Sequence, residues 1–382
     1  MDAGMKNQEK KADLGSRQRI LKYISKEKEV SRNEIAKGLS LSMPTVLAMT
    51  KELITEGVIE EVGAFESTGG RRAKKLTLSG SLGYSAGIDI TANHIGMVVV
   101  NLRGEVTEKI RLRMKFQNTL EYFENLVKKM DDFLADSCVQ NRQQIFGIGI
   151  SFPGIIDREK EILVRSHALQ VENVSLKNIS QMFSFPVLYE NDANSAAWAE
   201  MRNTSKDAVY LSLSNTVGGA IFLNGRIYEG NAYRSAEFGH MLLKINGRHC
   251  YCGRVGCVDA YCSAKLLSDA AGGNLTRFFQ ELDEKNKKFL HIWDEYLEDL
   301  ALTVNNLRNI FDSDVILGGY VGGFIEKYMG DLRKRVLNYS MFVQDVTYLK
   351  GCQVKQEASA AGIAMKFIDY YIESAFLPNK SI

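Results

Sequence analysis

Proline is scarce in this chain: four occur in 382 residues. Long helices and strands can therefore run without interruption. No stretch of 18 apolar residues occurs, and the charged first residues contain no apolar segment, so we expect neither a membrane-spanning helix nor a signal peptide. Excess charge is also missing, because 48 Lys and Arg residues oppose 46 Asp and Glu. Any surface for nucleic acid must therefore be local.

Cysteine is infrequent but unevenly placed. Three of the six cysteines, Cys250, Cys252 and Cys257, follow His240 at short spacing. One imidazole and three thiolates form a complete tetrahedral ligand set for zinc and leave no open position, so the predicted zinc is structural. The alternative is a set of buried free thiols beside an ordinary histidine. Few cysteines and a metal-type cluster favour the reducing cytoplasm over a disulfide framework.

The length suits two or three domains. We expect a disordered tail over 1–15, a winged helix-turn-helix over 16–80 and a larger body over 81–382. Three helices are predicted in 16–57: Ser16 caps the first, a Ser31–Glu34 capping box starts the second, and Ser42 caps the third. The short linker between the second and third is typical of a helix-turn-helix. The alternative is a small helical bundle with no DNA role.

The third helix should bury one stripe and present the other to DNA. The expected buried stripe is Val46, Leu47, Leu53 and Ile54. The expected DNA-contacting residues are Ser42, Met43, Thr45, Met49, Thr50 and Lys51. Two alternating apolar runs then flank a glycine turn rich in cations, the pattern of a wing that contacts phosphates. The expected wing contacts are Arg71, Arg72, Lys74 and Lys75.

Two segments resemble the signature of the ROK family, which groups sugar-responsive repressors with sugar kinases. They are Glu237-Phe-Gly-His240 and Gly247-x-x-Cys-x-Cys-Gly-x-x-Gly-Cys257. The resemblance extends from about Gly15 to Phe367. It implies an α/β fold class: an N-terminal winged helix-turn-helix followed by a two-lobed actin-like ATPase (ribonuclease H-like) sugar-kinase fold, with a zinc loop over 240–257.

The N-terminal region also resembles that of ROK repressors. Ser67-Thr-Gly-Gly-Arg-Arg72 is similar to their wing. The family usually has Pro after the two arginines and Ser after Thr-Val, where this chain has Ala73 and Leu47. These departures predict a different base preference.

The phosphate-binding glycines of the family's kinases are largely replaced. Asp89 is retained, but Thr91 and Ala92 stand at two glycine positions and Thr216 interrupts the second loop. Glycines allow backbone N–H groups to approach phosphate, so side chains at these places should obstruct it. We therefore expect no enzymatic activity. The alternative is an ATP-dependent ROK sugar kinase with an appended DNA-binding domain.

The sugar-facing segments look better preserved. The resemblance implies sugar contacts by Gly154, Asn191, Asp192, Glu237, His240 and Asp259. Asp192 lies where a strand ends and a helix begins, so it could instead be a helix cap. Asp259 replaces the family's usual Glu, and the loop 166–173 also departs from the family pattern. Because of these differences the sequence does not identify the sugar, and a pentose such as xylose is one of the candidates.

Together these patterns predict a cytoplasmic, sugar-responsive regulator of transcription, and they favour a repressor. Its partners would be operator DNA and a small sugar, and it would act as a homodimer or a dimer of dimers. A third hypothesis is a regulator that a protein partner sequesters through the zinc loop.

Overall fold

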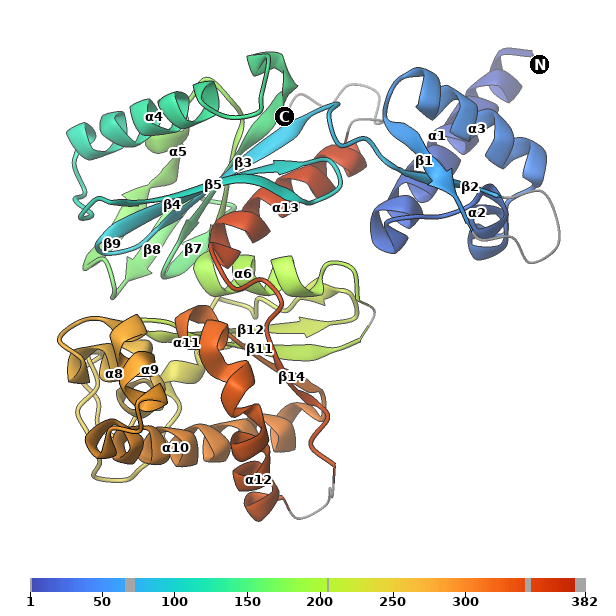
Figure 1. Cartoon of the computed structure of the whole chain (residues 1–382). Helices are drawn as coiled ribbons and strands as arrows, with labels where there is room; N and C mark the ends of the chain where they lie inside the picture. The colour runs from blue at the N-terminus through green and yellow to red at the C-terminus, as the bar shows by residue number, and fades with distance from the viewer. Residues whose placement is uncertain (1, 66–72, 205, 341–344, 375–382) are drawn as a thin grey trace.

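The structure, a computed structural model, describes residues 2–65, 73–204, 206–340 and 345–374 (Figure 1). A small N-terminal domain stands beside a body of two lobes, each built on a five-stranded sheet. Within these described ranges, no helix is both long and apolar enough to cross a membrane.

The N-terminal domain contains three helices and a two-stranded sheet. Its elements are α1 (Asp2–Glu27), α2 (Arg32–Leu39), α3 (Met43–Thr55), β1 (Ile59–Ala64) and β2 (Lys74–Leu78). The predicted capping box is present, since Ser31 accepts from the Glu34 backbone and Glu34 bonds back to Ser31. Ser42 caps α3 as predicted. A winged helix-turn-helix therefore forms from local signals that the sequence states clearly.

The predicted domain bounds, the tail over 1–15 included, stay a prediction, but the predicted cap at Ser16 is wrong. In the structure α1 begins at Asp2 and passes through Ser16 without a break. The segment 2–14 includes three Lys and two Ala residues, which favour helix, and it contains no proline.

The first lobe is built around a sheet in the order β10-β6-β3-β4-β5. These strands are β3 (Tyr84–Ile90), β4 (His94–Asn101), β5 (Val106–Arg113), β6 (Ile145–Phe152) and β10 (Val187–Asn191). Helices α4 (Leu120–Ala135) and α5 (Leu176–Ser180) belong to the same lobe, as does a small sheet of β7 (Ile155–Asp157), β8 (Ile162–Ser166) and β9 (Val171–Ser175). Parallel β3, β6 and β10 place the ends of β6 and β10 side by side, where Gly154 and Asp192 follow.

The second lobe has a sheet in the order β13-β12-β11-β14-β15. Its strands are β11 (Ala208–Leu213), β12 (Val217–Leu223), β13 (Arg226–Ile227), β14 (Asp314–Gly318) and β15 (Leu349–Gly351). Its helices are α7 (Asp259–Cys262), α8 (Ala264–Ala270), α9 (Leu275–Asp283), α10 (Lys287–Phe311), α11 (Gly319–Ile325) and α12 (Met329–Tyr339). A continuous apolar core joins these helices to one face of the sheet.

Two helices, α6 (Asp192–Met201) and α13 (Ala358–Ser374), pack together between the lobes (Figure 1). They approach so closely at Gly362 that an added Cβ would lie 1.6 Å from the Ser195 carbonyl oxygen. Glycine is therefore required at this crossing. The N-terminal ends of both helices lie at the cavity between the lobes, since Asp192 and Ala358 line it.

The other end of α13 reaches the N-terminal domain. Ile368 and Ile372 are buried in the same cluster as Ile20 and Ile24 of α1. Arg202, which follows α6, is 2.6 Å from Asp369 and 3.2 Å from the Ser25 hydroxyl of α1. The α6–α13 pair therefore connects a cavity between the lobes to the N-terminal domain.

Candidate functional site

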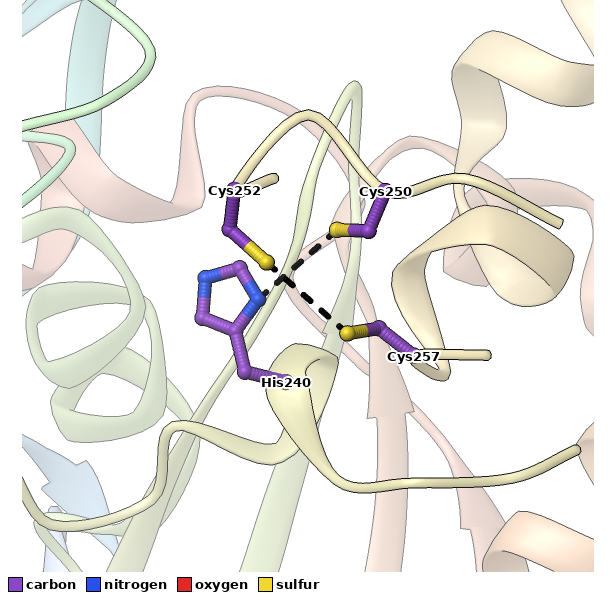
Figure 2. A group of neighbouring side chains, drawn as sticks. All are labelled: His240, Cys250, Cys252 and Cys257. Atoms are coloured by element: carbon purple, nitrogen blue, oxygen red, sulfur yellow. Dashed lines mark hydrogen bonds between the residues drawn. The ribbon is translucent and has the colours of Figure 1, made fainter. Parts of the chain in front are cut away.

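His240, Cys250, Cys252 and Cys257 point toward one another (Figure 2), and their ligand atoms all lie within 4.8 Å of each other. The Cys252 and Cys257 sulfurs are 3.8 Å apart, and His240 Nδ1 is 3.9 Å from the Cys250 sulfur. Tetrahedral zinc with Zn–S bonds of about 2.3 Å separates its ligand atoms by roughly 3.8 Å. The donor set therefore fits zinc, and these two separations match those of a tetrahedral site.

The second ring nitrogen of His240 faces a tyrosine. Nε2 lies 3.3 Å from the Tyr251 hydroxyl, and the His240 carbonyl accepts from Arg254 at 3.2 Å. His240 does not line either of the two cavities that meet at Asp192. The partner of Nε2 in the structure is thus a protein hydroxyl, where the sequence led us to expect a sugar hydroxyl.

A cavity between the lobes collects four of the six expected sugar-contacting residues. They are Gly154, Asn191, Asp192 and Glu237. Also in its wall are Glu190, Asn194, Gly218, Gly219, Glu229 and Tyr233.

Asp192 is one of the acids that line this cavity, and its side chain is half-buried. Burial, reinforced by the nearby Asp89 carboxylate, raises the pKa of Asp192 to about 7. The cap of α6 is Asn191, whose side chain accepts from the Asn194 backbone at 3.0 Å. The alternative interpretation of Asp192 as the helix cap is therefore wrong. Its carboxylate faces the cavity instead.

Gly154 and Asn191 hold each other in place. The Asn191 amide donates to the Gly154 carbonyl at 2.9 Å. Gly154 has φ +146°, and an added Cβ would lie 2.4 Å from the Arg165 carbonyl, so only glycine fits. These two residues shape the wall of the sugar cavity from the ends of β6 and β10.

Glu190, which the sequence analysis did not single out, stabilises this wall through ion pairs. Its buried carboxylate is 2.7 Å from Arg158 and also pairs with Lys366 of α13. These cations hold the pKa of Glu190 below its ordinary value despite the opposing effect of burial. Arg158 pairs in addition with Glu229 of the second lobe. The only sign of this role in the sequence is the position of Glu190, directly before Asn191 and Asp192 in the motif.

Glu237 and Asp259 differ in position. Burial raises the pKa of Glu237, which lines the same cavity as Asp192. Asp259 accepts from the Val217 backbone N–H at 2.5 Å, and it lines neither cavity. The expected sugar contact by Asp259 is therefore not supported: its carboxylate fixes the start of β12 instead.

Asp192 also lines a second cavity. Asp89, Thr91, Asn215 and Thr216 line it, so the predicted phosphate loops do meet here. Thr91 donates its hydroxyl to the His94 carbonyl at 2.9 Å. Gly219, one of the remaining loop glycines, packs against Phe238, where an added Cβ would lie 2.2 Å from the ring.

Protein side chains bridge this second cavity from lobe to lobe. Arg111 of β5 is 3.0 Å from Glu357 and donates to the Tyr320 hydroxyl at 2.6 Å. Burial raises the pKa of Asp89 to about 6. The cavity therefore already contains its own carboxylates and one cation that Glu357 engages. No local pattern in the sequence indicates this bridge, because Arg111 lies more than 200 residues from both Tyr320 and Glu357.

The DNA-facing side of α3 differs from the prediction. Met49 and Thr50 are buried together with Val46 and Leu53, whereas Leu47, expected in the core, is 50% exposed. The buried positions follow the i, i+3, i+4, i+7 spacing of one helix face. The Thr50 hydroxyl donates to the Val46 carbonyl at 2.7 Å. The exposed positions on α3 include Met43, Pro44, Leu47, Ala48 and Lys51.

The wing is only partly described. Arg71 and Arg72 lie outside the described residues. Lys74 pairs with Glu61, and Lys75 lies 2.7 Å from Glu29, so both expected phosphate contacts are engaged within the domain. Lys74 is still 58% exposed in its side chain.

Comparison with known proteins agrees with this architecture. The ROK family model matches residues 85–369, and a winged helix-turn-helix DNA-binding model matches residues 15–60. The xylose repressor of Caldicellulosiruptor bescii is 30% identical over 356 residues, covering 87% of this chain and 89% of the relative. The Bacillus subtilis xylose repressor is 29% identical over 298 residues, covering 76% and 74%.

Solved structures show the same fold. A ROK family transcriptional regulator, a homologue of the E. coli MLC protein, superposes with a TM-score of 0.73 at 19% identity over 96% of this chain and 99% of that chain. A Streptomyces griseus ROK glucokinase bound to glucose and AMPPNP gives a TM-score of 0.64 at 22% identity over 74% and 99%. The predicted fold class is confirmed, and the chain belongs to the ROK family, with a winged helix-turn-helix DNA-binding domain in front of its sugar-kinase fold.

Proposed function

We propose that the protein is a transcriptional repressor that a neutral sugar releases from its operator. The observation that carries this proposal is the continuous packing from the sugar cavity to the DNA-binding domain. Asp192 begins α6, α6 packs on α13, and α13 shares a buried cluster with α1. As a DNA-binding regulator, the protein acts in the cytoplasm.

A pentose such as xylose is the proposed sugar. Relatives named xylose repressor match this chain over most of its length. The cavity presents two carboxylates, Asp192 and Glu237, beside the Asn191 amide, and such groups bind sugar hydroxyls through hydrogen bonds. The wall has no unpaired cation among the described residues that would select a phosphorylated sugar.

The proposed release works through the two lobes. The walls of the sugar cavity come from both of them, Gly154 and Asn191 from the first and Glu237 from the second. A bound sugar favours the lobe arrangement in which both walls contact it. Helix α6 packs on β11 and β12 of the second lobe and on α13, and α13 packs on the first lobe and on α1. A change of lobe angle is therefore transmitted through α6 and α13 to α1. In a dimer or a dimer of dimers this changes the spacing of the two DNA-binding domains, and the repressor loses affinity only as far as the sugar distinguishes the two states.

Zinc has a structural role in this proposal. His240, Cys250, Cys252 and Cys257 would hold it, and with four protein ligands it offers no position for substrate. It fixes the loop that follows Glu237 in the chain, and so the position of one sugar-binding carboxylate.

One observation favours the kinase alternative. Asp192 has a pKa of about 7, which suits a general base for a sugar hydroxyl. Against it stand the side chains at the former glycine positions and the Arg111–Glu357 bridge across the second cavity. We therefore propose that the protein binds its sugar without phosphorylating it. Sequestration by a protein partner through the zinc loop remains a third hypothesis, which a pull-down would test.

A thermal-shift screen against neutral sugars and sugar phosphates tests the proposed function. A sugar that binds only the folded protein raises its stability by about 2.7 kcal/mol at a hundred times its Kd. We expect a neutral pentose to raise the melting temperature of the wild type but much less that of Asp192→Asn. A response to sugar phosphates alone, or equal responses of both proteins, would contradict the proposal.

A further inference from the structure

The exposed face of α3 has an unusual composition for a DNA-reading helix. As the second helix of the helix-turn-helix, α3 is the element that enters a major groove. Its thirteen residues include no Arg, Asn or Gln, the side chains that read guanine and adenine through paired hydrogen bonds. Lys51 and Glu52 are the only long polar side chains that the helix carries.

The hydroxyl groups at the start of α3 are already engaged. Ser42 accepts from the Thr45 backbone at 3.3 Å, and the two side-chain hydroxyls lie 2.8 Å apart. Thr50 is fully buried and bonded to the Val46 carbonyl. The one exposed acid near the middle of the helix, Glu52, faces Arg17 at 3.9 Å.

What the outward face does present is apolar. Leu47 is 50% exposed, Met43 is 37% exposed, and Pro44 and Ala48 are exposed beside them. One exposed leucine alone needs no explanation. Here, however, neighbouring turns of the same face are apolar, and Lys51 follows one turn later with an exposed side chain suited to phosphate.

We infer that Leu47 determines the base specificity of this protein by packing against the C5-methyl groups of thymine. The thymine methyl is the apolar group that bases present in the major groove, so it is the partner that an apolar helix face can read. The inference rests on the proposed function, because it requires α3 to enter operator DNA.

The test begins with duplexes that the full-length protein selects from a random-sequence library. In the enriched duplex each thymine is replaced singly by deoxyuridine, which removes the methyl group and keeps the pairing. Kd is measured by fluorescence anisotropy for the wild type, Leu47→Ser and Leu47→Ala. Leu120→Ser is the matched control, since Leu120 is a 67% exposed leucine on α4 of the first lobe.

We expect one or two thymines per half-site whose replacement weakens wild-type binding about fourfold each, the equivalent of one buried methyl-sized group. The same replacements should leave Leu47→Ser and Leu47→Ala unaffected, whereas Leu120→Ser should behave as wild type. Because Leu47 is exposed, these variants should keep the wild-type melting temperature. Enrichment of a duplex without any methyl-dependent thymine, or equal methyl dependence in Leu47→Ser, would overturn the inference alone. A library that yields no enriched duplex would overturn the proposed DNA binding as well.

Discussion

The ionisation of Asp192 should control sugar affinity. Burial raises the pKa of Asp192 to about 7 in the sugar-free protein, above the ordinary value near 4. A carboxylate accepts hydrogen bonds from sugar hydroxyls at both oxygens. The protonated acid accepts fewer, because one oxygen carries a proton. Raising the pH through 7 should therefore strengthen sugar binding, and lowering it should weaken binding.

The magnitude follows from the fraction ionised. With a pKa of about 7, roughly one molecule in eleven is ionised at pH 6 and ten in eleven at pH 8. If only the ionised form binds, affinity falls about tenfold from pH 8 to pH 6, or about 1.4 kcal/mol. Asp192→Asn should lose this dependence and bind about ten- to a hundredfold more weakly at pH 8, since removing a buried hydrogen-bond partner costs about 1–3 kcal/mol.

Isothermal titration calorimetry with xylose between pH 5.5 and 8.5 measures this directly. Glu237, whose pKa is also raised by burial, titrates in the same cavity, so the difference between wild type and Asp192→Asn isolates Asp192. Glu121→Gln, an exposed carboxylate on α4, is the control and should match the wild type. An affinity that stays constant from pH 6 to pH 8, or an equal pH dependence in Asp192→Asn, would refute the reasoning.

The remaining predictions concern the metal, the chemistry, the wing and the helix crossing. Purified protein should contain about one zinc per chain by elemental analysis, and Cys252→Ser should lose it and weaken sugar binding together; metal retained in that variant would contradict the ligand set. A coupled assay for ADP release over a panel of sugars should stay at background, and turnover that disappears in Asp192→Asn would promote the kinase alternative. Replacing Arg71 and Arg72 by Ala should weaken binding to all DNA sequences alike and flatten the salt dependence; an unchanged salt slope would count against the wing. Gly362→Ala should lower the free energy of unfolding by about 1–3 kcal/mol, measured by urea denaturation, because its Cβ would lie 1.6 Å from the Ser195 carbonyl; unchanged stability would show that α6 and α13 separate freely.

Features that depend on residues close together in the chain were predicted correctly from the sequence. The Ser31–Glu34 capping box and the Ser42 cap are present as expected, because each depends on residues three positions apart. The four expected metal ligands converge for a similar reason, since three of them share one short loop. The ROK signature predicted the fold class for the whole body.

Other features depend on tertiary packing between distant segments, and local sequence patterns did not predict them. Leu47 and Thr50 exchanged their expected environments, because a helix of this composition has more apolar residues than its buried stripe can hold. Asp259 matched a family position, yet its carboxylate turned to a backbone amide 42 residues away. The Arg111–Glu357 bridge and the α6–α13 contact join residues far apart in the chain, so no local pattern could indicate them.

Release of operator DNA by sugar tests the central claim most directly. A fluorescently labelled duplex, selected by the protein itself, is titrated with xylose in the presence of wild type or Asp192→Asn at pH 8. We predict that xylose releases the wild type, whereas Asp192→Asn binds the duplex equally well and needs about ten- to a hundredfold more sugar for release. If both proteins release the duplex at the same xylose concentration, the cavity at Asp192 is not the sensor.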